Sequence, residues 1–232
     1  MTRSHAPVPE SAFFTPALFA FLRELKVHND RDWFQANKGR YENDVKAPLL
    51  RFIAAFGEPL AGLNRHFLAD PRPVGGSMFR IYRDTRFAGP GSPYKTNAGA
   101  HFRHRDCARE VHSPAFYLHL QPRESFLAAG LWRPDAQALR QVRTRIVTHA
   151  RAWKALREGG IEVQGDALQR VPQGFDPAHP WADDLRLKDF YAVEGLTDRE
   201  VCAPDFLARF TEACRRHLPL LAFLAKAMDL PW

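Results

Sequence analysis

The N-terminal part of the chain repeats its apolar residues at the spacing of amphipathic helices. Thr15 followed by Pro16 is a typical helix start, and the stripe after it predicts a first helix. Asp30 can cap a second helix, which Pro48 interrupts. A third helix is predicted from apolar residues on one face: Leu49, Phe52, Ile53, Phe56, Leu60 and Leu63. The chain is therefore expected to open with helices alone.

The middle of the chain changes to short segments that alternate or are rich in β-formers. Gly, Pro or charged residues separate them, and no helical pattern lies between them. The four segments are Ser77–Arg83, Ala98–Arg103, Ala115–Gln121 and Ser125–Trp132. In the third, Phe116 and Leu118 share one face, while Tyr117 and His119 share the other. This pattern predicts an antiparallel sheet that is covered on one face.

Helical spacing returns at Pro134 and stops at Gly159-Gly160. Leu187–Val193 is expected to add a strand, and Thr197 to Glu200 has the form of a capping box. Pro204 opens a last helix that Pro219 kinks or divides. The pattern predicts one α+β domain over residues 1–232, a mostly antiparallel sheet flanked by N-terminal, central and C-terminal helices. The first ~12 residues are expected to pack loosely.

Composition excludes several classes of protein. Apolar residues make up 45% of the 232 residues, and no apolar run approaches the ~20 residues that cross a bilayer. The three cysteines form no C-x-x-C pair, which favours free thiols in a reducing compartment over a disulfide or zinc framework. The N-terminal apolar stretch lacks the small-residue cleavage site of a signal peptide. We therefore expect a cytoplasmic protein with no membrane partner.

The positive charge of the chain gives weaker evidence about its binding partners. The chain has 33 basic and 26 acidic residues, a formal charge of +7, and 26 of the 33 basic residues are arginine. Such a skew towards arginine is also produced by a GC-rich coding bias, and the arginines are spread over the whole chain. The charge permits nucleic-acid binding without favouring it strongly.

The densest polar cluster begins in the first expected strand. If Ser77–Arg83 is a strand, Phe79 and Ile81 face the core, and Arg80 and Tyr82 project from the opposite face. A loop with glycine and proline follows the strand and returns a tyrosine and a lysine to the same neighbourhood. Positive side chains therefore converge at one end of the expected sheet.

These cations fit an anionic ligand. Arg80, Arg83, Arg86 and Lys95 can clamp the oxygens of a phosphate or carboxylate, and Asp84 can orient the arginines. The alternative is a structural network in which Asp84 pairs with Arg83 or Arg86 and holds the loop. An aspartate among arginines is favoured in its charged form, so Asp84 is a weak general base. The two interpretations can also coexist.

Proton transfer would need another group. His119 and Tyr94 are the candidate catalytic residues, although the favoured interpretation of His119 is a histidine bonded to its neighbours in the sheet. His101 and His104 have a spacing that places them on opposite faces of a strand, so they are not expected to share a metal. No zinc, P-loop, dinucleotide or G-x-S-x-G motif is present, and no metal or cofactor is predicted.

An N-terminal segment supplies further candidates. Arg31, Asn37 and Lys38 lie in an unusually polar stretch that also carries Trp33 and Phe34. One interpretation is a helix whose aromatic residues pack while its charges are solvated. The other is that Arg31, Asn37 and Lys38 line the same pocket as Arg83.

Several of these motifs together resemble a known family. They are Asn29-Asp-Arg-Asp-Trp-Phe34, Phe79 to Phe87, Pro93-Tyr-Lys95, Tyr117-Leu-His119, Gly130 to Pro134, and Arg170 to Pro180. The resemblance covers about Phe14 to Leu224 and is to a bacterial family named domain of unknown function 2461, also called the 02453 family of conserved hypothetical proteins. It implies one conserved domain and supplies no activity.

This chain departs from the family pattern in one place. Pro90-Gly91 stand where the family usually has an Asp/Asn-Lys pair, and basic residues are missing at Gln169 and Gln173. A lysine that could have touched a ligand is therefore absent. The sequence predicts a site for an anionic small molecule, with catalysis left open. A nucleic-acid-binding module and a partner-binding protein with apolar ends, Phe13-Phe14 and Leu230 to Trp232, are the alternatives.

Overall fold

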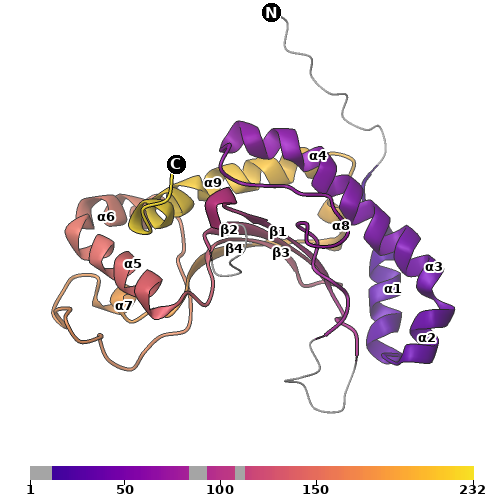
Figure 1. The fold of residues 1–232 in the computed structure, drawn as a ribbon, viewed down its shortest axis with the longest axis horizontal. Coiled ribbons are helices and arrows are strands. Elements are labelled where there is room, and N and C mark those ends of the chain that lie inside the picture. Colours follow the sequence, from indigo (N-terminus) through magenta and orange to yellow (C-terminus); the bar gives the residue numbers. More distant parts are fainter. Residues whose placement is uncertain (1–11, 84–92, 108–112) are drawn as a thin grey trace, which may run out of the picture.

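The computed structural model of the protein describes residues 12–83, 93–107 and 113–232. Its centre is a curved antiparallel sheet in which each strand pairs with the next along the chain (Figure 1). The strands are β1 (Ala98–Arg103), β2 (Ala115–Leu120), β3 (Ser125–Leu131) and β4 (Phe190–Leu196). The predicted α+β class is confirmed. The expected strands Ala98–Arg103, Ala115–Gln121 and Ser125–Trp132 match β1, β2 and β3 to within one residue.

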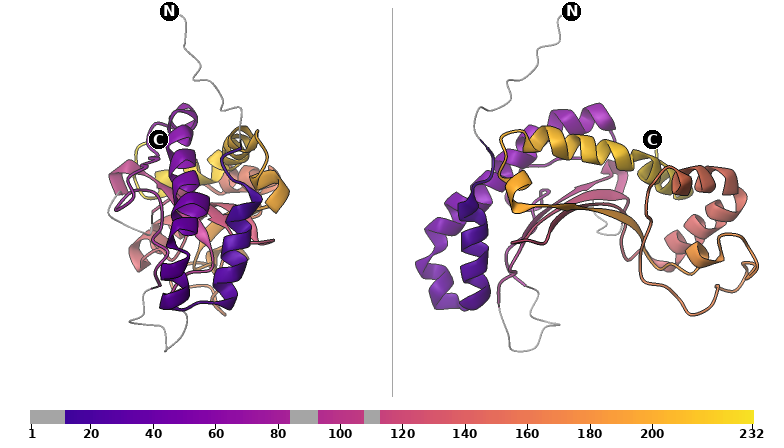
Figure 2. Two further views of the ribbon diagram at one scale, coloured as in Figure 1. Left: turned by 90° about the vertical axis from the view of Figure 1, so that its right-hand side faces the viewer. Right: turned by 180° about the vertical axis from the view of Figure 1, so that it is seen from behind.

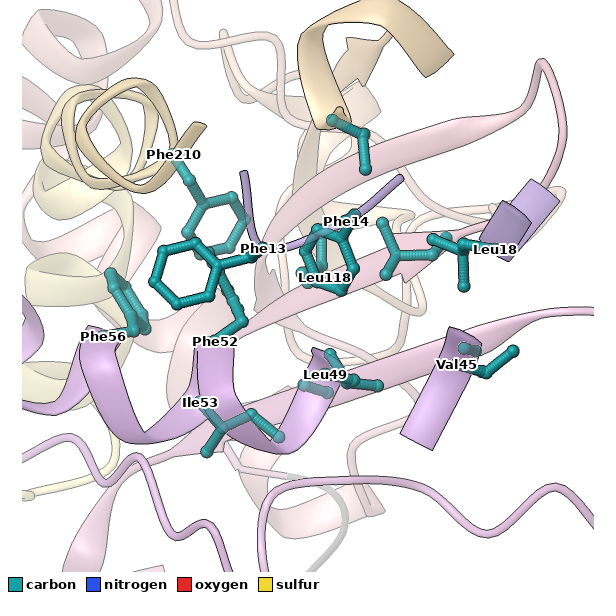
Figure 3. Packing of buried hydrophobic residues seen from close by; sticks show 14 of the residues in the cluster. Phe13, Phe14, Leu18, Val45, Leu49, Phe52, Ile53, Phe56, Leu118 and Phe210 are labelled. Atoms are coloured by element: carbon teal, nitrogen blue, oxygen red, sulfur yellow. The ribbon is translucent and has the colours of Figure 1, made fainter. Parts of the chain in front are cut away.

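Two long helices, α4 (Ala47–Leu63) and α9 (Phe206–Ala227), cover the convex face of the sheet (Figure 1). Between them and the sheet lies a core rich in phenylalanine, in which Phe52 and Phe56 of α4 contact Phe210 of α9 (Figure 3). On the sheet side, Leu118 lies in this core. The apolar residues that alternate along the strands thus pack against helices on one face of the sheet, as the sequence predicts.

Helices at each end of the sheet give the molecule the shape of an arch (Figure 2). At one end lie α1 (Pro16–Val27), α2 (Arg31–Ala36) and α3 (Lys38–Arg40), and at the other α5 (Ala136–Thr148), α6 (Ala150–Glu158) and α7 (Ala182–Leu185). A second apolar cluster, around Trp153 and Phe223, joins the latter group to the C-terminal half of α9. Among the described residues, no helix lies over the concave face of the sheet.

The helical start of the chain is predicted correctly except at Pro48. Asp30 caps α2 by accepting from the backbone N–H of Trp33. The chain does not break at Pro48: after α3 it continues through a π-helical stretch, η1 (Tyr41–Lys46), into α4. The N–H of Ala47 bonds to the carbonyl of Glu42, five residues back, so the wider turn precedes the proline. Pro48 then occupies the first turn of α4, where no N–H is required.

The other helical predictions hold with one correction. The expected helix after Pro134 is two helices, because His149 leaves helical geometry and ends α5 before α6 begins. The capping box of Thr197 and Glu200 is present at α8 (Asp198–Val201). Pro219 lies inside α9, which continues through it.

The expected strand Ser77–Arg83 is not formed. Single bridges replace it: Met78 pairs with Ala100 of β1, and Tyr82 pairs with Tyr94. The segment leaves β1 after Phe79, whose N–H donates to the carbonyl of Gly99, and then pairs with residues 93–95. The alternation of a continuous strand is broken between those two pairings. This change of partner reverses the orientation predicted for Phe79.

The apolar residues near the two ends, which the sequence offered as a docking surface, mostly pack against other parts of the same chain. Phe14 is fully buried and Phe13 nearly so, both against Phe52. Trp232, partly exposed, packs edge-on against Phe67. Residues 1–11, for which loose packing was expected, lie outside the described residues. Among the described residues, no helix has both the length and the apolar character to span a bilayer.

Candidate functional site

The concave face of the sheet carries a cavity of about 620 Å³. It is built from strand positions that alternate with the buried ones: Gly99 and His101 lie between Ala98, Ala100 and Phe102, which face the helices. The described lining residues are Phe79, Arg80, Lys95, Asn97, Gly99, His101, Ser113, Ala115, Tyr117, Phe126, Ala128, Ala129, Gly130, Trp132, Gln164, Tyr191 and Val193. Its volume is within the range of small-molecule sites.

Two cations stand at the β1 side of the cavity. Lys95 lies three residues before Ala98, where β1 begins, and its ammonium lies 5.3 Å from the centre of the Phe79 ring. Arg80 adjoins Phe79 on the segment that pairs with Gly99 of β1. Burial lowers the pKa of Lys95, and the positive charge of Arg80 lowers it further. None of the described lining residues is acidic, so the electrostatic character of this part of the cavity is positive.

Phe79 belongs to the cavity and not to the core. The sequence placed it with Ile81 on the buried face, but its side chain is 37% exposed while Ile81 is buried. Its ring stacks on His101 with centroids 5.9 Å apart and meets Tyr117 edge-on at 5.8 Å. The ammonium of Lys95 and two aromatic rings therefore hold Phe79 as a wall of the cavity.

The floor of the cavity depends on a close approach at Gly99. A Cβ atom at this position would lie 2.6 Å from the hydroxyl oxygen of Tyr117, so any side chain there would displace the tyrosine. Tyr117 is largely buried, which raises its pKa to about 12. The phenol is therefore neutral at physiological pH and can act as a hydrogen-bond donor.

Aromatic side chains form the opposite side of the cavity. Trp132 follows β3, and Tyr191 lies in β4 beside Gln164, with which it forms an isolated bridge. The neighbouring Arg133 has a left-handed backbone, and its N–H donates to the buried carboxylate of Asp189 at 2.6 Å. Its guanidinium stands 4.8 Å from the centre of the Trp132 ring. These contacts position Trp132 at the rim.

Ser113 adds a buried hydroxyl to the lining. The residue is 2% exposed, and within the described part of the chain its Oγ has no hydrogen-bond partner. A buried hydroxyl without a partner has a cost in free energy that a polar ligand atom would remove. Ser113 is therefore a candidate polar contact for a bound molecule.

His119 lies next to the cavity in a polar network. Its Nδ1 is 3.0 Å from the hydroxyl of Tyr117, and its Nε2 is 3.3 Å from Oε1 of Gln121. The amide nitrogen of Asn97, a donor, lies 3.1 Å from Nδ1 and 3.3 Å from Nε2, so both ring nitrogens of His119 lie within this network. The ring also stacks on Phe126 at 4.6 Å. Burial lowers the pKa of His119, so the neutral form is favoured near pH 7. His119 thereby orients Tyr117, and it is not itself among the lining residues.

Tyr94, the other candidate for proton transfer, lies away from the cavity. It is 3% exposed, and its ring stacks on Phe34 of α2 at 4.0 Å. The side chain of Asn29 bonds both backbone polar groups of Tyr94, accepting from its N–H and donating to its carbonyl, each at 3.0 Å. Tyr94 therefore attaches the N-terminal helices to the segment that carries Lys95.

The other residues predicted around Arg83 do not line the described part of the cavity. Arg83 is exposed and is not among the lining residues, while Asp84, Arg86, Pro90 and Gly91 lie outside the described residues. Their predicted role, and the alternative of a structural network around Asp84, stay predictions.

The N-terminal candidates do not share the cavity. Arg31 and Lys38 are exposed on α2 and α3, and Asn37 bonds locally to the carbonyl of Trp33 and the guanidinium of Arg40. None of the three is among the described lining residues. Phe34 of this segment packs on Tyr82 and Tyr94, which form an isolated bridge before β1, and this contact explains why the polar segment also carries aromatic residues.

Sequence reasoning found the cations but not most of the cavity. Arg80 and Lys95 were predicted, whereas Phe126, Tyr191, Val193 and Gln164 were not. A signal was present: in β3, Phe126 and Ala128 alternate with the buried Leu127 and Ala129, as Tyr117 does in β2. No pattern in the sequence pointed to Gln164, which reaches the cavity from a loop through its bridge to Tyr191.

Comparison with known proteins gives a family and no further relative. The sequence model of the family described as "Conserved hypothetical protein (DUF2461)" matches residues 17–223. No curated protein matches the chain. No solved structure matches it.

Proposed function

The chain belongs to the DUF2461 family of conserved hypothetical proteins, and we propose that its concave sheet face binds a small molecule with an anionic group on an aromatic or aliphatic body. The anionic group is a carboxylate or a phosphate. The proposal rests on one observation. Arg80 and Lys95 lie near each other at one side of a cavity whose other described lining residues are apolar or neutral.

Electrostatics supports an anion between the two cations. Burial lowers the pKa of Lys95, and repulsion between its ammonium and the positive charge of Arg80 lowers that pKa further. A carboxylate or phosphate bound there would replace that repulsion with charge-assisted hydrogen bonds. Arg80 can offer two N–H groups in parallel, and Lys95 can add a third donor.

The rest of the cavity supports an apolar or aromatic body. Phe79, Tyr117 and Phe126 line one part of it, and Trp132 and Tyr191 line the other. Flat rings on both sides favour a planar or elongated ligand, which would stack on them while Ser113 and Gln164 bond its polar atoms. The geometry supports binding more directly than catalysis, because the described lining residues include no base in contact with a nucleophile.

A thermal-shift screen tests the proposal with matched pairs of compounds. Each pair consists of an aromatic carboxylate or phosphate and its neutral amide or alcohol. A ligand at 100 times its Kd adds about 2.7 kcal/mol of stability, roughly 5–10 °C for a chain of this size. We expect anionic members to raise the Tm and neutral members to have little effect.

Two variants identify the site of binding. Lys95→Met keeps an unbranched side chain at this position and removes the charge, so we expect affinity for the anionic members to fall ~10–100-fold. Arg151→Gln removes a positive charge from the exposed surface of α6, and we expect no change. Equal losses in both variants, or none in either, would refute a specific role of Lys95.

A further inference from the structure

A second group of polar side chains lies on the other side of the sheet. His104 continues the alternation of Ala98, Ala100 and Phe102, so it faces the helices while His101 faces the cavity. It is fully buried, and its ring stacks on that of His66 with centroids 5.4 Å apart. One ring nitrogen from each histidine and a carboxylate oxygen of Asp106 lie within 4.8 Å of one another.

Backbone pairing fixes both histidines. His66 follows α4, and its carbonyl accepts from the N–H of Arg105, while Phe67 bridges to His104. Asp106 follows in the short 3₁₀ turn η2 (Arg105–Cys107), with its carboxylate 3.9 Å from Nδ1 of His104. The three groups are therefore brought together by the main chain and not by flexible side chains alone.

These groups can offer lone pairs to a metal ion, which would replace one long hydrogen bond of 3.4 Å from the backbone N–H of Asp106 to Nδ1 of His104. Nε2 of His104 is 2.8 Å from the carbonyl of Pro231, which can only accept, so Nε2 carries the proton and Nδ1 does not. Histidines that bind metals typically donate from their other nitrogen to a carbonyl in this way. Nδ1 of His66 is buried and, within the described residues, has no hydrogen-bond partner.

The geometry points to a binding site for a divalent transition ion, with zinc as the best match, formed by His66, His104 and Asp106. Two imidazoles and one carboxylate are ligands that zinc prefers, and three protein ligands leave one position for water or another donor. Ligand atoms around tetrahedral zinc are ~3.4 Å apart, so the present spacing must contract. Asp106, whose side chain is 46% exposed, is free to rotate for this.

Titration of the chelator-treated full chain with zinc chloride tests this site. We expect one zinc ion per chain, with an affinity at least ~10-fold weaker in His66→Asn and in Asp106→Asn. His149→Asn, which removes a histidine at the junction of α5 and α6, is the matched control and should bind as the wild type does. His104 is left unchanged because it is fully buried, and circular dichroism checks that each variant folds.

Cobalt(II) gives a second measurement. A tetrahedral nitrogen and oxygen site should develop visible absorption bands on cobalt addition, and these should be lost in His66→Asn. Absence of a saturable zinc site, or wild-type affinity in both His66→Asn and Asp106→Asn, would overturn the proposal. Because the cavity lies on the opposite face, either result leaves the proposed anion binding unaffected.

Discussion

Lys95 links the electrostatics of the cavity to its proposed ligand. Its ammonium is stabilised by the Phe79 ring but destabilised by burial and by Arg80, and the last two lower its pKa below the ordinary 10.5. An anion bound beside it would favour the charged form and raise that pKa again. By linkage, binding of the anion and protonation of Lys95 must strengthen each other.

This linkage predicts a pH dependence of binding. At pH values well below the pKa of Lys95 its ammonium is charged, and affinity for an anionic probe should be constant. As the pH rises through the pKa of Lys95, which lies below 10.5, the ammonium loses its proton and affinity should fall. In Lys95→Met the affinity should be lower and nearly flat over the same range, because arginine stays charged. Calorimetric titrations at a series of pH values measure this, and a parallel decline in both proteins would contradict it.

Residue identity alone predicted the cations but not the orientation of their neighbours. Arg80 and Lys95 were recognised because their charges are conspicuous in a segment with glycine and proline. Phe79 was assigned to the wrong face because strand alternation was assumed from Ser77 to Arg83. The segment instead changes pairing partner after Phe79, so Phe79 lines the cavity while Ile81 is buried as predicted.

At the scale of elements, Gly130 lets β3 and β4 meet beside the cavity. Its φ is +147°, and a Cβ atom there would lie 2.2 Å from the carbonyl oxygen of Phe190 and 2.5 Å from Cα of Tyr191. Both neighbours are backbone atoms in β4 and cannot rotate away. The position of Tyr191, and so one wall of the cavity, depends on this approach.

Gly130→Ala is therefore expected to destabilise the fold strongly. Strain at the unfavourable φ and displacement of β4 should together cost about 3 kcal/mol of unfolding free energy. Gly195→Ala, in β4 itself, is the matched control: a Cβ there meets nothing within 4 Å, so the change should be within ~1 kcal/mol. Urea unfolding of both variants provides the measurement. Similar midpoints for the two would show that the β3–β4 approach is not constrained.

Periodicity predicted the elements well where local signals and packing agree. The sheet, α1, α4 and α8 follow from alternation, helical stripes and caps that the core then satisfies. The errors fall where non-local pairing or helix geometry decides. No proline or glycine marks the end of α5 at His149. The helix continues past Pro48 because a π-helical turn precedes the proline, and no pattern in the sequence specifies that turn.

At the scale of the whole molecule, the arch leaves one face of the sheet for function. Helices α4 and α9 bury the convex face, and the helices at both ends extend beyond the sheet (Figure 2). The formal charge of +7 is spread over the chain, whereas the described cavity lining contributes only Arg80 and Lys95 as its lysines and arginines. That distribution favours a small anion over a nucleic acid, whose backbone requires a row of cations.

The most direct test of this account is to map the binding site by NMR. An anionic compound selected by thermal shift would be titrated into isotope-labelled protein. We predict backbone amide shifts concentrated at Gly99, Tyr117, Ala128 and Val193, on the concave face of all four strands, and their loss in Lys95→Met. Shifts centred instead on Arg31 and Lys38 of the N-terminal helices, or a pattern that Lys95→Met leaves unchanged, would contradict it.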